Sequence, residues 1–169
     1  MIRTFTRRGW AAILVAVGAA PLLPMVAGAM PTLALVNETR SLPRGLYVRR
    51  FGEDIRRGGT AAAEQPAPAR SYLESLGAPA DMLLLKRVAA VGGDRVCREN
   101  DRVVTPTGEV GVLARDRRGS ALAAWTDCRR LDADEVFLLG DAAESFDSRY
   151  FGPVDRSELR GVFTAVATW

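Results

Sequence analysis

The sequence predicts an all-β domain of antiparallel strands, preceded by one N-terminal transmembrane helix. The first observation is the pattern from residue 82 onward, where short apolar runs are separated by Gly, Asp and Asn. The second is the stretch 10–36, which contains no charged residue over 27 positions. Because a helix needs roughly 20 apolar residues to cross a bilayer, this stretch is long enough to span one.

Basic residues set the expected orientation of this helix. Three of them precede the apolar stretch and no acidic residue does: Arg3, Arg7 and Arg8. Cytoplasmic flanks carry the excess of Lys and Arg, so we expect a cytoplasmic basic tail (1–9), a transmembrane anchor (10–31) and an extracytoplasmic domain (32–169). The small residues at 27–29 also fit the cleavage pattern of a secretory signal peptide, and removal of the N-terminal segment is the alternative.

The net charge of +3 and the pI of about 9.3 do not indicate nucleic-acid binding. Of the 23 basic residues, three belong to the orientation signal, which leaves 20 basic residues against 20 acidic ones, all from Glu38 onward. A neutral domain lacks the basic face that binds phosphate backbones. We therefore exclude nucleic acid as a partner.

The expected elements begin with two short strands at 32–36 and 46–50, joined by a turn-rich loop at 37–45. The Gly-, Ala- and Pro-rich segment that follows predicts a flexible surface insertion at about 53–80, with one short helix at 70–76. All remaining elements are expected to be strands. They lie at 82–91, 95–98, 102–105, 109–113, 135–139 and 161–168.

Cys97 and Cys128 are the only cysteines. An even pair in an exported domain is more typical of a disulfide than of a metal or redox site. Because the chain has no histidine, a zinc site would have to complete its ligand set with carboxylates, and we expect no metal and no cofactor. A bridge would stabilise the fold by roughly 3 to 4 kcal/mol on the chain-entropy account; two free thiols are the alternative.

Lys86 is the candidate for acid–base chemistry. It is the only lysine in a chain with 22 arginines and no histidine, and it ends the apolar run 82–85. Arginine stays charged at any accessible pH, whereas burial can discharge a lysine, which then acts as a base. On a strand, Lys86 and Arg87 point to opposite faces, so Lys86 can be buried while Arg87 stays in solvent. Leu84 and Val88 share the face of the lysine and would supply the desolvation.

Ser41 is the candidate nucleophile. A serine hydroxyl attacks only when a neighbour removes its proton, and a neutral lysine amine can do so. Ser41 follows the apolar stretch closely, in a loop where Pro43 and Gly45 can fix an exposed and unusual backbone conformation. Four other serines are typical of ordinary structural positions: Ser71, Ser75, Ser120 and Ser157.

Three blocks of the chain occur in a characteristic order. They are Ser41-Leu42-Pro43 with Gly45 and Tyr47, then residues 85–94, then Gly140-Asp141 with residues 145–154. Together they resemble the type I signal peptidase (S26) family. The Asn-x-Thr-x-Ser-x-Pro-x-Gly-x-Tyr arrangement of 37–47 looks most like the conjugative-transfer, pilin-maturation peptidases of the TraF type. The resemblance implies a signal-peptidase-like antiparallel β domain with a Ser/Lys dyad.

By position, the resemblance implies that Ser41 is the nucleophile and Lys86 the general base. It gives the Thr39 hydroxyl a place in the oxyanion hole beside the Ser41 backbone N–H, and it gives Ser145 the role of orienting the lysine amine. Structural residues near the site would be Pro43, Gly45, Gly140, Asp141, Asp147 and Arg149. Among these, Gly140 and Asp141 match a strand turn, and Asp147 and Arg149 match an ion pair, for which a plain surface pair is the alternative.

The chain departs from the housekeeping signal peptidases at two places. Ala142-Ala143 replaces the usual Asn-Arg after Gly-Asp, and Leu42 replaces the methionine that usually follows the nucleophile. These departures favour a specialised substrate over general preprotein processing.

The resemblance implies a membrane-anchored serine endopeptidase that processes an exported propeptide such as a conjugative pilin precursor. Its expected location is the bacterial inner membrane, with the catalytic domain in the periplasm. The lipid bilayer and other components of a conjugation apparatus are its expected partners. Two alternatives stay open: a transpeptidase that cyclises the pilin with the same dyad, and a non-catalytic, anchored β scaffold of a secretion system.

Overall fold

The structure, a computed structural model, describes residues 31–169 and shows an all-β domain with few helices. Its strands are β1 (Ala34–Asn37), β2 (Gly45–Arg50), β3 (Thr60–Ala63), β4 (Leu84–Val91), β5 (Arg95–Glu99), β6 (Arg102–Thr105), β7 (Gly108–Gly111), β8 (Cys128–Arg130), β9 (Glu135–Leu139), β10 (Val154–Asp155) and β11 (Leu159–Thr168). Its helices are α3 (Ala67–Ser75), α4 (Ser148–Phe151) and the short 3-10 turn η1 (Arg156–Glu158). The expected all-β class is confirmed.

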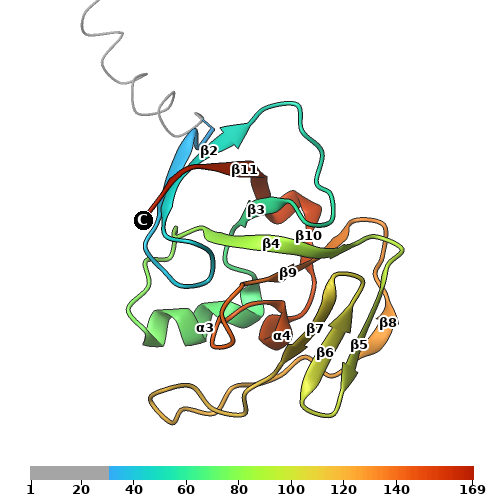
Figure 1. Ribbon diagram of the computed structural model, residues 1–169. Helices are drawn as coiled ribbons and strands as arrows, with labels where there is room; N and C mark the ends of the chain where they lie inside the picture. The colour runs from blue at the N-terminus through green and yellow to red at the C-terminus, as the bar shows by residue number, and fades with distance from the viewer. Residues whose placement is uncertain (1–30) are drawn as a thin grey trace, which may run out of the picture. The chain divides into compact units, whose positions relative to one another are not determined.

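The strands of this described range form two antiparallel sheets (Figure 1). The larger sheet has the order β1-β2-β11-β3-β4-β9-β10, and the smaller one has the order β7-β6-β5-β8. Segments far apart in the sequence lie side by side, because β11 pairs with both β2 and β3. β4 lies between β3 and β9, so the strand that carries Lys86 is an inner strand of the larger sheet.

Most expected strands are present with ends shifted by a few residues, and 102–105 and 135–139 agree with β6 and β9. The expected helix at 70–76 corresponds to α3, which begins earlier, at Ala67. Pro68 in its first turn suits this earlier start, because proline has no N–H to leave unpaired there. The short elements β8, β10 and α4 were not expected, since two to four residues carry too little pattern.

The expected flexible surface insertion at about 53–80 contains an inner strand, so for residues 60–63 this expectation was wrong. The segment supplies β3, which lies between β11 and β4 in the larger sheet. Ala61, Ala62 and Ala63 are fully buried there. Ala61 and Ala63 pack into one hydrophobic cluster and Ala62 into another. The inner position therefore takes small side chains on both faces, and alanine, a weak strand former, has little strand signal of its own.

The expected basic tail and nearly all of the expected membrane anchor fall in residues 1–30, outside the described residues. Between residues 31 and 169, none of the helices combines the length and the apolar character that a membrane crossing requires. The compact unit that contains all the strands runs from Leu33 to Trp169.

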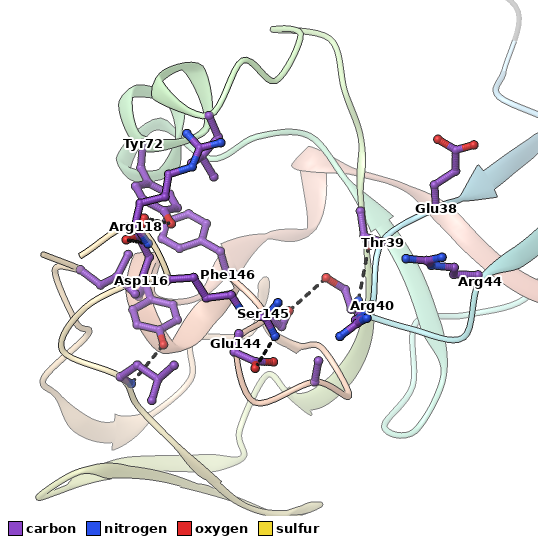
Figure 2. Close-up of a pocket in the computed structure, with 17 residues that line it drawn as sticks. Glu38, Thr39, Arg40, Arg44, Tyr72, Asp116, Arg118, Glu144, Ser145 and Phe146 are labelled. Carbon is purple, nitrogen blue, oxygen red and sulfur yellow. Dashed lines mark hydrogen bonds and ion pairs between the residues drawn. The ribbon is translucent and has the colours of Figure 1, made fainter. Parts of the chain in front are cut away.

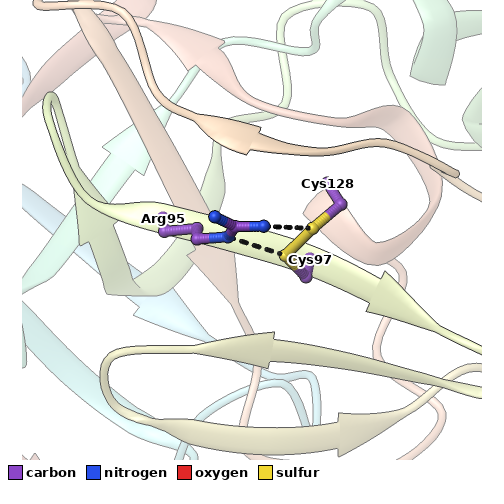
Figure 3. Close-up of a disulfide and its surroundings, with 3 residues drawn as sticks. All are labelled: Arg95, Cys97 and Cys128. Carbon is purple, nitrogen blue, oxygen red and sulfur yellow. Dashed lines mark hydrogen bonds between the residues drawn. A yellow bond between two sulfur atoms is a disulfide. The ribbon is translucent and has the colours of Figure 1, made fainter.

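Cys97 and Cys128 form a disulfide, as the cysteine count predicted (Figure 3). They are direct partners across β5 and β8 in the smaller sheet. The Arg95 guanidinium donates hydrogen bonds to both sulfur atoms, at 3.3 Å and 3.4 Å. The bridge ties β8, the edge strand of this sheet, to its neighbour.

Candidate active site

Ser41 lies in the tight loop that joins β1 to β2. These strands pair as far as Asn37 and Gly45, so the chain must reverse within residues 38–44. Leu42, which is 2% exposed, anchors the loop in the core and leaves the neighbouring Ser41 half-buried at its surface. The cluster around Leu42 contains Tyr47, Ala62, Leu85 and Phe163.

Pro43 and Gly45 support the base of this loop. The Tyr47 hydroxyl donates a hydrogen bond to the Pro43 carbonyl oxygen at 2.8 Å. A side chain on Gly45 would overlap the backbone of Ala167 on β11, so glycine is required by the close approach of that strand. Both residues therefore lie where the resemblance placed them, next to the turn that presents Ser41.

The Lys86 amine lies within hydrogen-bond distance of two serine hydroxyls that are far apart in the sequence, those of Ser41 and Ser145. Lys86 Nζ lies 2.6 Å from Ser41 Oγ and 2.8 Å from Ser145 Oγ. Ser145 Oγ in turn lies 3.2 Å from Ser41 Oγ. The three polar atoms form a closed triangle of hydrogen bonds. Lys86 is only 4% exposed, whereas Arg87 points to the other face and reaches solvent, as strand alternation predicts.

Burial lowers the pKa of Lys86 from its ordinary value of 10.5 to about 8. The two nearby charges act in opposite directions on this pKa, since Asp147 raises it and Arg149 lowers it. Desolvation therefore decides the shift. With a pKa near 8, an appreciable fraction of Lys86 is neutral close to neutral pH and can accept a proton from the adjacent hydroxyl.

Asp147 and Arg149 form a buried ion pair, not the surface pair that was the alternative. Their side chains are 0% and 1% exposed, and Arg149 Nη2 lies 2.8 Å from Asp147 Oδ2. Asp147 Oδ2 also accepts the Gly140 backbone N–H at 2.8 Å. The guanidinium donates further hydrogen bonds to the carbonyl oxygens of Gly111, Ala142, Ala143 and Ser145. Because every polar group of the pair has partners, it holds the turn that carries Ser145.

Asp141 connects this turn to the loop of Ser41. Its backbone N–H donates to the Ser41 carbonyl oxygen at 2.6 Å. Its carboxylate accepts two hydrogen bonds from Arg87, at 2.8 Å and 3.0 Å. Gly140 and Asp141 thus join the end of β9 to both the serine loop and β4.

Thr39 lies two residues before Ser41, and its hydroxyl is already hydrogen-bonded. Thr39 Oγ1 accepts the Ser41 backbone N–H at 3.4 Å and donates to Asn37 Oδ1 at 2.8 Å. Sequence reasoning assigned no role to Asn37, although this residue opens the Asn-x-Thr-x-Ser motif. The signal available in the sequence was its position as the first residue of that motif.

Two cavities meet at Ser41. The smaller, about 300 Å³, lies beside β1 and β4. Its apolar lining comprises Leu35, Val36, Leu73, Met82, Leu83, Leu84, Leu85 and Phe146. The larger, about 560 Å³, has a more polar lining; Figure 2 shows Arg40 on one side of it and Tyr72 and Asp116 on the other. Ser41 belongs to the lining of both cavities, so a ligand in either one lies next to it.

Within residues 31–169, no cluster of three His, Cys, Asp or Glu side chains is placed to bind a metal ion. The polar groups at Ser41 are hydroxyls, amides and one amine. The chemistry that this arrangement can support is proton transfer from a hydroxyl to an amine, followed by nucleophilic attack of the oxygen.

Sequence comparison identifies the family. The chain belongs to the signal peptidase, peptidase S26 family, whose model matches residues 5–169. Two plasmid transfer proteins TraF of Escherichia coli are 32% and 33% identical to it, over 92% and 94% of this chain and 94% and 96% of their own lengths. A conjugal transfer protein TraF of Agrobacterium fabrum is 34% identical over 79% of this chain and 82% of its own length. The resemblance to the signal peptidase family and the likeness to TraF proteins, both noted from the motifs, are confirmed.

Among solved structures, a signal peptidase I from Enterococcus faecalis V583 matches with a TM-score of 0.42 and 23% identity. The match covers 66% of this chain and 98% of that chain.

Proposed function

We propose that this chain is a serine endopeptidase in which Ser41 is the nucleophile and Lys86 the general base. The observation that carries the proposal is the 2.6 Å distance between Lys86 Nζ and Ser41 Oγ, formed by a buried lysine whose pKa is lowered to about 8. A nucleophile and a base within hydrogen-bond reach, with the base oriented by a third group, are typical of covalent catalysis. Ser145 is that third group.

The reaction follows from these positions. Neutral Lys86 takes the Ser41 proton as Oγ attacks the scissile carbonyl carbon. The resulting ammonium then returns the proton to the leaving amine nitrogen while the C–N bond breaks, which leaves an ester on Ser41. Water, deprotonated by Lys86, attacks that ester and releases the acid and the serine. The Ser41 backbone N–H and the Thr39 hydroxyl would stabilise the oxyanion.

The proposed substrate is an exported propeptide, in particular a conjugative pilin precursor. The names of the TraF relatives, which are plasmid and conjugal transfer proteins, support the conjugation context. The two cavities that meet at Ser41 support a peptide as ligand.

The proposed location is the bacterial inner membrane, with residues 10–31 as the anchor and the domain in the periplasm. The uncharged stretch with arginines before it supports this topology. The disulfide supports an oxidising compartment for the domain.

The test uses the full chain in detergent and a purified pilin precursor, with products identified by intact mass. Ser41→Ala, Lys86→Ala and the double variant should all fall to the same residual level, since members of a dyad act as one unit. Ser120→Ala, which changes an exposed turn serine, should cleave normally. Lys86→Arg should be inactive because arginine does not release its proton, and appreciable turnover by this variant would refute the dyad.

The same masses separate the alternatives. A hydrolysed product has the mass of the free mature chain, whereas a cyclised product is lighter by one water. A scaffold would give neither product and would form no covalent adduct at Ser41.

A further inference from the structure

The Asn37 side chain forms several hydrogen bonds with the loop that carries Ser41, although the proposed reaction gives it no role. Asn37 is the last residue of β1 and is 7% exposed. Its Nδ2 donates to the carbonyl oxygens of Thr39, Leu42 and Pro43, at 3.1 Å, 3.0 Å and 3.2 Å. Its Oδ1 accepts both the backbone N–H and the hydroxyl of Thr39, at 3.2 Å and 2.8 Å. One carboxamide therefore contacts both limbs of the loop.

These contacts serve carbonyl oxygens that lie outside the pairing of β1 and β2, which ends at Asn37 and Gly45. The Ser41 and Arg44 carbonyl oxygens accept from the backbone N–H groups of Asp141 and Trp169, whereas Asn37 donates to those of Thr39, Leu42 and Pro43. A carboxamide has two N–H donors and one acceptor oxygen, and Asn37 uses both sides of it within a single turn. Asn37 thus holds the Leu42 carbonyl oxygen next to Ser41, in addition to the core packing of the Leu42 side chain.

The hydrogen bonds also have a direction. A hydroxyl has one proton, and the Thr39 proton points to Asn37 Oδ1. Thr39 Oγ1 is thereby free to accept the Ser41 N–H. The two oxyanion donors implied by the family resemblance thus form one chain, from Ser41 through Thr39 to Asn37, when no substrate is present.

We propose that Asn37 is a positioning residue of the oxyanion hole, which holds the Thr39 hydroxyl while the site is empty and releases its proton to the oxyanion as that charge forms. An oxyanion is a stronger acceptor than an amide oxygen, so the Thr39 hydroxyl rotates toward it in the transition state. The release costs little, because Asn37 Oδ1 keeps the Thr39 backbone N–H as a partner. This inference rests on the proposed function.

The kinetic test compares Asn37→Asp in two backgrounds. The aspartate keeps the shape and the acceptor but loses the donors, and its charge holds the Thr39 proton more tightly than the amide oxygen does. Asn37→Asp should lower kcat by about 10- to 100-fold, with KM changed less than about threefold, because the interaction is used in the transition state. In a Thr39→Val background the same change should lower kcat by a much smaller factor. Equal factors in both backgrounds, or a loss confined to KM, would overturn the proposal.

A second measurement does not depend on cleavage. Amide hydrogen exchange of residues 38–44 should be faster in Asn37→Ala than in the parent chain, since the loop loses its internal partner. Thr105→Val is the matched control: Thr105 is 8% exposed and also donates to a carbonyl of its own turn, that of Gly108 at 3.0 Å, but it lies in the smaller sheet. This control should change neither kcat nor exchange at 38–44.

The two readouts separate the two proposals. A parent chain that cleaves nothing overturns the proposed function and, with it, the release of the Thr39 proton. Unchanged exchange in Asn37→Ala overturns the positioning of the loop by Asn37, whatever the parent chain cleaves.

Discussion

Gly140 and Ser145 lie so close together that a methyl group on Gly140 would overlap the Ser145 hydroxyl. A Cβ atom there would also lie 2.6 Å from Ser145 Cβ and 3.0 Å from the Ser41 carbonyl oxygen. Since Ser145 Oγ accepts a hydrogen bond from Lys86 at 2.8 Å, the missing side chain at Gly140 is a condition for the position of the lysine amine.

Gly140→Ala should therefore lower kcat/KM for the proposed pilin-precursor substrate at least as much as Ser145→Ala does. The added methyl must displace Ser145, the Ser41 loop or both, and displacements of this size in a catalytic group cost on the order of 10²-fold. Gly111→Ala is the matched control, because a Cβ at Gly111 meets nothing within 4 Å. Cleavage by Gly140→Ala at the parental rate would show that the site tolerates this overlap.

The pH dependence of cleavage should follow the ionisation of Lys86. Because its pKa is lowered to about 8 and the neutral amine is the proposed base, kcat/KM should rise with pH through a midpoint near pH 8 and then level off. Cleavage of a precursor at a series of pH values from 6 to 9.5 measures this midpoint. A profile that is flat over this range would exclude Lys86 as the titrating base.

Ser145→Ala tests whether Ser145 orients the lysine. The fold should persist, but a four-carbon stem without its second hydrogen-bond partner samples other positions, and kcat should fall by roughly 10²-fold. The midpoint of the pH profile should move to lower pH, because the lost hydroxyl accepts more strongly from the ammonium than from the amine. A parental rate with an unchanged midpoint would mean that another group positions Lys86.

The parts of the fold that could be predicted are those with a local pattern. Alternation located β6, in which every second residue is buried. β9 was located as a short apolar run between turn residues, and it is buried on both faces. β3 could not be found in this way. Its Thr-Ala-Ala-Ala sequence becomes a strand only because β11 and β4 leave room between them for small side chains, and this condition is set by distant segments.

The candidate site divides along the same line. Ser41, Lys86 and Ser145 could be proposed because residue type and motif order point to them, and the structure brings their polar atoms within hydrogen-bond distance of one another. The contacts of Asn37 and Arg149 could not be predicted, because each side chain donates to backbone carbonyl oxygens, which every residue has. Which carbonyls these are depends on how the loops fold back.

The disulfide should stabilise the domain without taking part in cleavage. Cys97 and Cys128 lie in the smaller sheet, whereas Lys86 lies in the larger one. Replacing both cysteines by alanine should lower the free energy of unfolding by about 2 to 4 kcal/mol in urea titrations, with little change in kcat at 25 °C. Intact mass without reductant should be two hydrogens below that of the reduced chain. Two thiols that alkylate freely in the native protein, purified without reductant, would contradict the bridge.

Lys86 should cost the protein stability at neutral pH, since a cation is buried there without a carboxylate in contact. Its folded-state pKa of about 8 lies below the ordinary value of 10.5, so the unfolded chain binds more protons between these values and stability rises with pH across this interval. Below pH 8 the penalty is fully present, at on the order of 3 kcal/mol.

Lys86→Met removes the charge and keeps the length of the side chain, but it also removes the hydrogen bonds to Ser41 and Ser145. Those bonds are worth about 1 kcal/mol each. The variant should therefore be inactive, yet more stable than the parent by about 1 kcal/mol at pH 7, and this advantage should vanish or reverse by pH 10. Urea unfolding at both pH values measures the difference. A Met variant that is less stable by the same amount at pH 7 and pH 10 would show that burial does not penalise the Lys86 charge. The lowered pKa, which is the physical reason for proposing Lys86 as a base, would then be wrong.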